Sequence, residues 1–449
     1  MISEEMNRTL TRTGPGTEAG AVLRRYWQPV ALTDEFDGDR PVRPVTLLGE
    51  RLVAFRDEQG RYGLIDRHCP HRGADLCFGR LEDGGLRCPF HGWNFDVSGQ
   101  CLETPAEPED STFFQKIKTT AYPCVERNGI VFAYMGPLED GEEPPAFPSL
   151  DCFVAPDAYT FAFKGLIECN WLQALEVGID PAHASFLHRY LEDDDPNQGY
   201  GKQFRDFVGG TDIPMTRILR EFPRPKIQVE NTDFGLRIKS LRDLNGEAMH
   251  VRVTNQIFPQ AITIPMSQEM TITQWHVPVD DETCYWYAIF TSFGKPVDKA
   301  LMKAQRLDLY EMPDYIPKIG KRNNYAYDPA QQQSRTYTGM GDDINVHDQW
   351  AVESLGPIQD RTKEHLATSD IAIGAYRRLL LRAIKTIKTG EGKLPINSAE
   401  GGPASVFGPI AVDTVAPPDN WTDSWIATDK ARRDAAPWSN EAVTSAAAE

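Results

Sequence analysis

The sequence contains no long apolar run. No stretch of its 449 residues approaches the roughly 18 consecutive apolar residues of a membrane-spanning helix. The opening "MISEEMNRTLTRTGPGTEAG" also lacks the basic start and the apolar core of a secretory signal. Both absences argue against a membrane partner, and we expect a cytoplasmic protein.

Positive charge is scarce as well. The chain has 47 Lys and Arg residues against 65 Asp and Glu residues, which gives a formal net charge of −18. Nucleic acids are polyanions that bind to basic surfaces, so we expect no nucleic-acid partner. An anionic substrate would meet the same repulsion and would need arginine side chains close to it.

Cysteine is too sparse for a disulfide scaffold, because only eight cysteines are spread along the chain. Cys69 and Cys88 alone lie beside histidines at metal-ligand spacing. The other six are expected to be small buried hydrophobic residues.

Hydrophobic alternation predicts an α+β fold in which a small antiparallel all-β domain precedes a larger domain with an antiparallel sheet covered by helices. We expect the small domain over 43–140 and the larger one over 150–395, joined by a stretch rich in Pro and Glu. Residues 1–42 are expected to pack on the larger domain. Residues 396–449 are rich in Pro, Ala and Ser, and we expect them to wrap the surface or fray.

Two helices are predicted in the larger domain. One covers residues 171–192 and contains an Asp-Pro interruption. The other begins after Ser369 or Asp370 as the N-cap and stops at Gly390.

The first candidate site lies in "CPHRGADLCFGRLEDGGLRCPFHGW", which pairs each of two cysteines with a histidine. Zinc sites usually group like ligands, as in C-x₂₋₄-C and H-x₃₋₅-H. A [2Fe–2S] cluster with two thiolates on one iron and two imidazoles on the other fits mixed pairs better. We favour the cluster over zinc, and the expected ligands are Cys69, His71, Cys88 and His91. His68 is expected to be a surface or hydrogen-bonding residue.

The second candidate site is the D-x-x-H-x-x-x-x-H run of Asp180, His183 and His188. Asp180 and His183 would be neighbours on one helical face. His188 would point about 140° away from His183 on an ideal helix, so both could bind one metal only if the helix is distorted or ends there. Two partly buried histidines on an amphipathic helix are the alternative.

The first run and its continuation "CPFHGWNFDVSGQC" resemble the Rieske signature of ring-hydroxylating oxygenases, and "NW" followed by the second run resembles their mononuclear iron site. The resemblance implies a Rieske domain over 43–140 and a mononuclear iron catalytic domain over 150–395. It implies His183 and His188 as two ligands of an Fe(II) facial triad. It also implies that Asp180 links a ligand histidine to a cluster histidine, His91, of a neighbouring subunit.

The third ligand is expected to be a carboxylate. Asp348 is followed five residues later by Glu353, a spacing that the family shows at this ligand. Asp360 is expected to be a surface or salt-bridging residue, and Asp370 a helix cap. We therefore favour Asp348.

The resemblance is strongest to phthalate-dioxygenase-like enzymes, which implies an aromatic acid and O₂ as substrates, a separate NADH-dependent reductase, and a homotrimer or stacked trimers. Arginines that could bind the acid are Arg205 and Arg242, the latter continuing an apolar row of an expected strand. The reaction is either ring hydroxylation or O-demethylation of a lignin-derived methoxylated acid of the dehydrodivanillate type. A Rieske electron carrier without catalysis of its own is the rival hypothesis.

Overall fold

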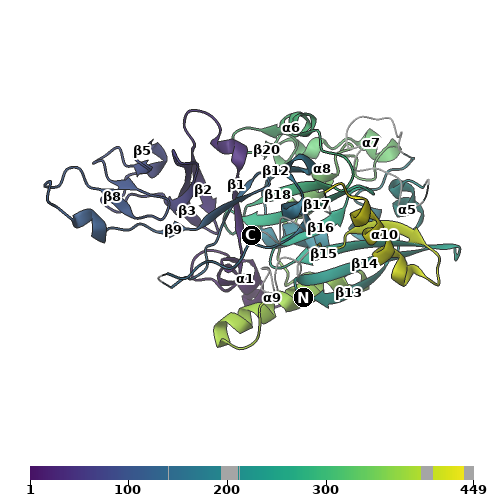
Figure 1. Cartoon of the computed structure of the whole chain (residues 1–449). Coiled ribbons are helices and arrows are strands. Elements are labelled where there is room, and N and C mark those ends of the chain that lie inside the picture. The colour runs from purple at the N-terminus through teal and green to yellow at the C-terminus, as the bar shows by residue number, and fades with distance from the viewer. Residues whose placement is uncertain (140, 194–210, 212, 396–407, 439–449) are drawn as a thin grey trace.

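The computed structural model describes residues 1–139, 141–193, 211, 213–395 and 408–438. Its two parts extend side by side in Figure 1, with short strands at the left and a large sheet flanked by helices at the right. The predicted fold class, a small antiparallel β domain followed by a larger α+β domain, is confirmed.

The small domain contains two four-stranded antiparallel sheets. The first runs in the order β2 (Val42–Leu47), β3 (Glu50–Arg56), β4 (Tyr62–Asp66) and β9 (Ala121–Tyr122). The second runs β5 (Arg80–Glu82), β6 (Gly85–Arg87), β7 (Asn94–Phe95) and β8 (Cys101–Glu103). A separate apolar core that includes Phe55 and Phe95 joins the two sheets, so this part of the chain folds around its own centre.

The large sheet has eight strands, all paired antiparallel. Its main order is β12 (Thr160–Ile167), β18 (Cys284–Ser292), β17 (Met270–Pro278), β16 (Ala261–Pro265), β15 (Ala248–Ile257), β14 (Gly235–Leu244) and β13 (Lys226–Thr232). These strands coincide with the segments of the sequence in which the residue type alternates. Successive side chains of a strand point to opposite faces of the sheet, so two faces with different surroundings favour such alternation.

The expectation that the chain beyond residue 395 only wraps the surface or frays is wrong for its described part. β21 (Val412–Ala416) pairs with β15 as the eighth strand, and α10 (Trp421–Ala435) packs on it. A five-residue strand in which Asp413 and Thr414 interrupt the apolar residues gives too short and irregular a signal to stand out in a stretch rich in Pro and Ala.

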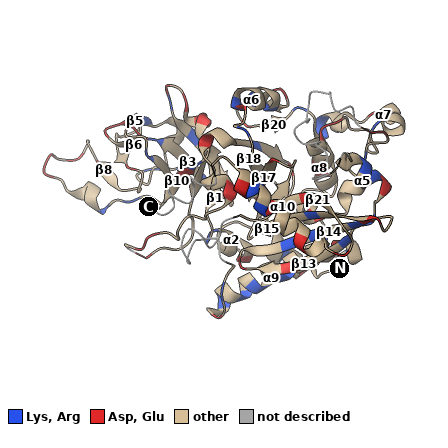
Figure 2. Ribbon diagram, turned by 45° about the vertical axis from the view of Figure 1, so that its right-hand side comes forward, with Lys and Arg blue, Asp and Glu red and all other residues tan. Residues whose placement is uncertain are grey.

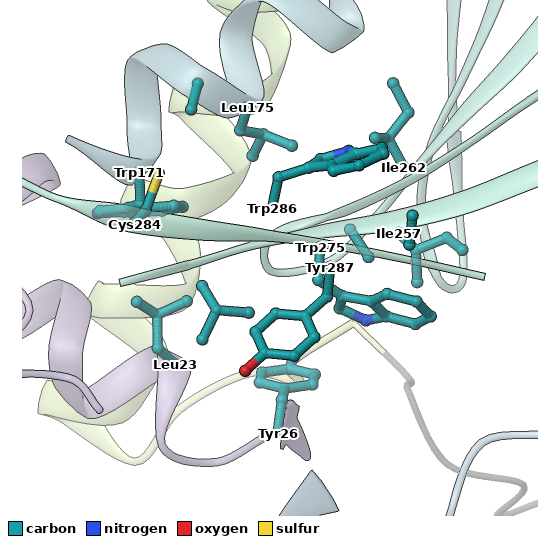
Figure 3. Close-up of a cluster of buried hydrophobic side chains, with 14 of the residues drawn as sticks. Leu23, Tyr26, Trp171, Leu175, Ile257, Ile262, Trp275, Cys284, Trp286 and Tyr287 are labelled. Atoms are coloured by element: carbon teal, nitrogen blue, oxygen red, sulfur yellow. The ribbon is translucent and has the colours of Figure 1, made fainter. Parts of the chain in front are cut away.

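Helices cover both faces of the large sheet. Adjacent residues of β18 point to opposite faces: Trp286 lies with Leu175 of α4 (Trp171–Ile179), and Tyr287 lies with Leu23 and Tyr26 from the N-terminal segment (Figure 3). The Tyr287 hydroxyl donates to the Val30 carbonyl at 2.8 Å. The remaining N-terminal elements are α1 (Glu4–Thr11), α2 (Glu18–Leu23) and β1 (Gln28–Leu32), and β1 forms a three-stranded sheet with β11 (Ile130–Ala133) and β10 (Cys124–Arg127).

α9 (Ile371–Thr389) confirms the second predicted helix, with Asp370 at the N-cap and Gly390 in the left-handed region at φ 69°. Basic positions gather on this helix in an otherwise acidic chain (Figure 2). The other elements are α3 (Asp151–Val154), α5 (Met215–Glu221), α6 (Lys299–Leu307), β19 (Tyr310–Glu311), β20 (Ile316–Pro317), α7 (Pro329–Ser334) and α8 (Ile344–Glu353). None of the helices in the described ranges combines the length and the apolar character that a membrane crossing needs.

Candidate metal centres

Two loops of the small domain follow the same backbone path. In each, a cysteine carbonyl accepts a hydrogen bond from the glycine four residues later, Gly73 to Cys69 at 2.8 Å and Gly92 to Cys88 at 3.0 Å. The Cys69 amide donates to the Ala74 carbonyl, and the Cys88 amide donates to the Trp93 carbonyl, both at 2.8 Å. The glycines have φ values of 78° and 77°, which only glycine adopts without steric cost. Two Cys-Pro-x-x-Gly segments thus form a matched pair of turns.

The paired turns place like ligands together. The ring centroids of His71 and His91 are 4.5 Å apart, and the Cys88 side chain is close enough to Cys69 to add to the rise that burial causes in the pKa of the Cys69 thiol. Among the described residues of this domain, no three ligand atoms of His, Cys, Asp or Glu all lie within 4.8 Å of one another. Four ligands of one zinc ion would lie about 3.3–3.8 Å apart. A sulfur pair beside an imidazole pair therefore fits two irons rather than one ion.

The chemistry of these side chains also fits a bound cluster. Burial raises the pKa of the Cys69 thiol to about 12, so a thiolate here requires a metal in place of the proton. His91 Nδ1 is buried and has no hydrogen-bond partner. The His71 ring is stacked on Trp93 with the centroids 4.4 Å apart, which fixes its orientation.

In the large domain, His183, His188 and Asp348 each bring one ligand atom into a group that spans less than 4.8 Å. The Nε2 atom of His188 lies 3.2 Å from Nε2 of His183 and 3.2 Å from Oδ1 of Asp348. The third distance, from Nε2 of His183 to Oδ1 of Asp348, is 3.7 Å. Ligands bound at about 2.1 Å and at right angles are separated by about 3.0 Å, so one face of an octahedral ion fits these atoms.

The predicted helix over 171–192 is wrong beyond Ile179, where α4 ends. Asp180 is its C-cap, with extended φ and ψ angles, because the residue before a proline disfavours the helical conformation. His183 begins a single 3₁₀ turn (His183–Ser185), and His188 lies in the irregular segment that follows. The end of the helix is what allows both rings to face one point.

Asp180 fixes the proton of His183. His183 Nδ1 donates to the Asp180 carbonyl, which leaves Nε2 as a free ligand atom, and one carboxylate oxygen of Asp180 lies 3.8 Å from Nδ1. The other carboxylate oxygen accepts from the Ala182 amide at 2.7 Å. Burial raises the pKa of Asp180 and lowers the pKa of His183, so the imidazole is neutral at pH 7.

Asp348 projects from α8. Burial alone would raise its pKa, but the nearby His188 and His183 hold it below its ordinary value. Its Oδ1 atom is buried and accepts no hydrogen bond. This orphaned carboxylate oxygen fits a metal ligand. Of the other candidates, Asp360 pairs with Lys363 at 2.8 Å and Asp370 accepts from the Ala367 amide at 2.6 Å.

A cavity of about 220 Å³ lies between the triad and the large sheet. Arg242 reaches it from β14 and is 1% exposed. Its guanidinium donates to three neutral oxygens, those of Phe222 (3.0 Å), Ser240 (2.9 Å) and Ser185 (3.2 Å). Burial lowers its pKa to about 10, so it is still charged at pH 7. Arg205 lies outside the described residues.

Five further charged residues line this cavity without having been predicted, namely Arg252, Arg306, Asp342, Asp343 and Asp413. Arg252 of β15 lies in the polar row of its strand, between His250 and Thr254, so the signal that singled out Arg242 at the end of an apolar row was absent there. Asp413 of β21 binds both Arg252 and His250, and Arg306 enters from α6. Neither Asp413 nor Arg306 carries a local signal, because only the long-range folding brings them to this wall.

Comparison with known proteins agrees with both centres. Residues 26–123 match a family model described as "Rieske [2Fe-2S] domain", and residues 133–412 match one described as "LigXa C-terminal domain like". Over 422 residues the chain is 35% identical to the phthalate 4,5-dioxygenase oxygenase subunit of Pseudomonas putida, which covers 88% of this chain and 89% of that one.

The chain belongs to the Rieske oxygenase family.

This Rieske oxygenase is also 32% identical over 400 residues to the 5,5'-dehydrodivanillate O-demethylase oxygenase subunit of Sphingobium sp. (strain NBRC 103272 / SYK-6), over 87% of this chain and 82% of that one. Among solved structures, the QL mutant of NdmA from Pseudomonas putida CBB5 shares the fold, with a TM-score of 0.55 and 20% identity over 83% of this chain and 94% of that one.

Family membership confirms several predictions. The protein is an enzyme, an oxygenase component that depends on a separate reductase, and its cofactors are a [2Fe–2S] cluster and a mononuclear non-haem iron. The rival hypotheses of a zinc site and of an electron carrier without catalysis are therefore wrong.

Proposed function

We propose that this Rieske oxygenase uses O₂ and NADH-derived electrons to hydroxylate an aromatic carboxylic acid of the phthalate type. The observation that carries this proposal is Arg242, a buried guanidinium with neutral partners in the same cavity as the triad. A carboxylate matches the fork of a guanidinium and would supply the missing counter-charge.

The cluster is held by Cys69, His71, Cys88 and His91, and the iron by His183, His188 and Asp348. When bound, the two groups supply electron transfer and the activation of O₂. Asp180 keeps the Nδ1 proton of His183 in place. Arg242 orients the acid, and apolar side chains from the middle of the sheet, Ile264, Ile272 and Phe290, exclude water from the ring.

Electrons are proposed to enter the iron site from another copy of the chain. The strands of the cluster domain and α8, which carries Asp348, lie toward opposite ends of the molecule in Figure 1. The cluster loops are flanked by exposed aromatic side chains, Phe78 at 72% and Phe90 at 55%. Near the triad, Phe186 is 47% exposed. These apolar surfaces support a homotrimer, or stacked trimers, in which Asp180 faces His91 of the neighbouring copy.

O-demethylation is the second candidate function, because the chain is similar to a 5,5'-dehydrodivanillate O-demethylase oxygenase subunit. Both reactions require the same triad and differ in which carbon of the substrate faces it. O-demethylation releases formaldehyde, whereas ring hydroxylation does not.

A screen of aromatic acids tests the proposal. The holoenzyme, supplied with a reductase and NADH, should consume O₂ on addition of an aromatic acid but not of the corresponding amide, with formaldehyde assayed alongside. Arg242→Gln should raise KM for the acid about tenfold to hundredfold, because a charge-assisted hydrogen bond is lost. Equal use of the acid and the amide would refute the carboxylate specificity.

A further inference from the structure

Buried cations in this protein are paired with carboxylates, except in the cavity. Five Lys or Arg residues are buried in the described part of the chain. Three of them lie outside the cavity, and each forms an ion pair: Lys164 with Glu35, Arg361 with Glu176, and Arg377 with Glu176 and Glu364. The other two, Arg242 and Arg306, line the cavity and have no carboxylate partner among the described residues.

Arg306 is the more isolated of the two. It is 5% exposed, and its Nη1 atom is buried without any hydrogen-bond partner. Its guanidinium carbon lies 5.3–5.8 Å from the ring centroids of Phe163, Trp286 and Phe290. Cation–π contacts with these rings contribute a modest favourable free energy. An unpaired buried charge costs more than that, so the rings do not account for the position of Arg306.

The two arginines reach the cavity from opposite ends of the strand order, on the same face of the sheet. Arg242 lies on β14, whereas Arg306 descends from α6 onto β12 and β18. In Figure 1, α6 lies at the top of the large domain and β14 at the bottom. Three strands separate β18 from β14, and four steps of about 4.8 Å put these two strands about 19 Å apart. Besides burial, the charges that act on the pKa of Arg242 are those of Asp413 and Arg252, and Arg306 is not among them. We infer that the two guanidiniums lie too far apart for one carboxylate to neutralise both.

We propose that Arg306 determines specificity by binding a second anionic group of the substrate, at the end of the cavity remote from Arg242. The preferred substrate is then an elongated aromatic dianion, with negative groups at the two ends of two linked rings. This assignment rests on the proposed function and deepens it.

Calorimetric titration of the holoenzyme tests the proposal with two probes that share the same biphenyl frame. Biphenyl-4,4'-dicarboxylate should bind about tenfold to hundredfold more tightly than biphenyl-4-carboxylate, because only the former offers a carboxylate to each guanidinium. Arg306→Gln should remove this preference. The matched control is Lys303→Gln on the same helix, because Lys303 pairs with Asp34 at the surface and should leave the preference intact.

Arg306→Lys keeps the charge and should retain a reduced preference. An unchanged content of about three irons per chain shows that each variant is folded, the catalytic domain included. Equal affinity of the wild-type enzyme for the two acids would overturn the role of Arg306 alone, whatever the variants do. So would a preference that survives in Arg306→Gln. If neither acid binds and neither stimulates O₂ uptake, the proposed function fails together with this assignment.

Discussion

The two metal centres draw their ligands from very different lengths of chain. The four cluster ligands come from two adjacent copies of one short turn, and each turn is closed by its own backbone hydrogen bonds. The triad takes two histidines from the end of α4 and its carboxylate from α8, far downstream. A centre built from local turns is recognisable by its spacing, whereas a centre built across a domain depends on the whole fold. The predictions below test whether the two centres are as independent as this difference implies.

The largest effect should come from removing one ligand of each centre. His183→Ala should lower the iron content from about three to about two atoms per chain and reduce turnover to background, because two ligands no longer enclose the ion. His91→Ala should lose the red-brown cluster and keep about one iron. Metal analysis together with the paramagnetic signal of the reduced cluster measures both. Loss of all iron in either variant would show that the centres are not independent.

Asp180→Asn should keep both cofactors but slow turnover about tenfold to hundredfold, because it removes the carboxylate proposed to link His183 to His91 of the neighbouring copy. The backbone carbonyl that holds His183 remains in this variant. The measurement is the rate at which the reduced cluster is reoxidised in a single turnover with O₂ and substrate. Asp370→Asn is the matched control, since Asp370 is close enough to raise the pKa of Asp180 but does not contact His183. An unchanged reoxidation rate would remove the linking role of Asp180.

The matched cluster turns should differ in their tolerance of a methyl group. Gly73→Ala should cost about 1 kcal/mol, the strain of a positive φ, because a Cβ there meets no atom within 4 Å. Gly92→Ala should cost about 1–3 kcal/mol more, since its Cβ would lie 2.6 Å from Cγ of Pro105. Thermal loss of the cluster's circular dichroism gives both values. Equal losses would mean that Pro105 moves aside freely.

The smallest effect is a pH dependence confined to the cluster domain. A hydrogen bond from Arg67 lowers the pKa of Asp75 to about 2, against an ordinary value of 3.8. A lowered pKa stabilises the folded state above about pH 4, and this contribution is lost as the pH falls toward 2. Because solvent screens the Arg67–Asp75 pair, we expect it to contribute about 1 kcal/mol to the free energy of unfolding. Acid unfolding of Arg67→Gln should lack this component; an identical profile would contradict it.

The sequence predicted what is encoded locally. The strands β13–β18 follow from alternation, and the limits of α9 follow from Asp370 and Gly390. The cluster ligands follow from two short spacings, although their assignment is still a prediction. In each case the signal lies within about 20 residues, the range over which periodicity and capping act.

What the sequence missed depends on long-range contacts. The helix over 171–192 was extended past Asp180 because the apolar period continues beyond Pro181, although the proline already forbids it. In the sequence, Arg306 is indistinguishable from an ordinary charged residue of an amphipathic helix. Only the fold shows that its side chain is buried without an ion-pair partner among the described residues. Asp348 was selected by a family spacing, but its distance from the two histidines follows from the packing of α8 against α4.

The insertion of β21 beside β15 has a consequence for the order of synthesis. A nascent chain completes both cluster turns before a quarter of it has left the ribosome, yet the wall that holds Arg252 stays open until Asp413 emerges. The cluster turns can therefore form early in translation, whereas the cavity wall can form only near its end. If translation stalled shortly before that strand, the nascent chain would carry a complete cluster domain and an incomplete substrate cavity.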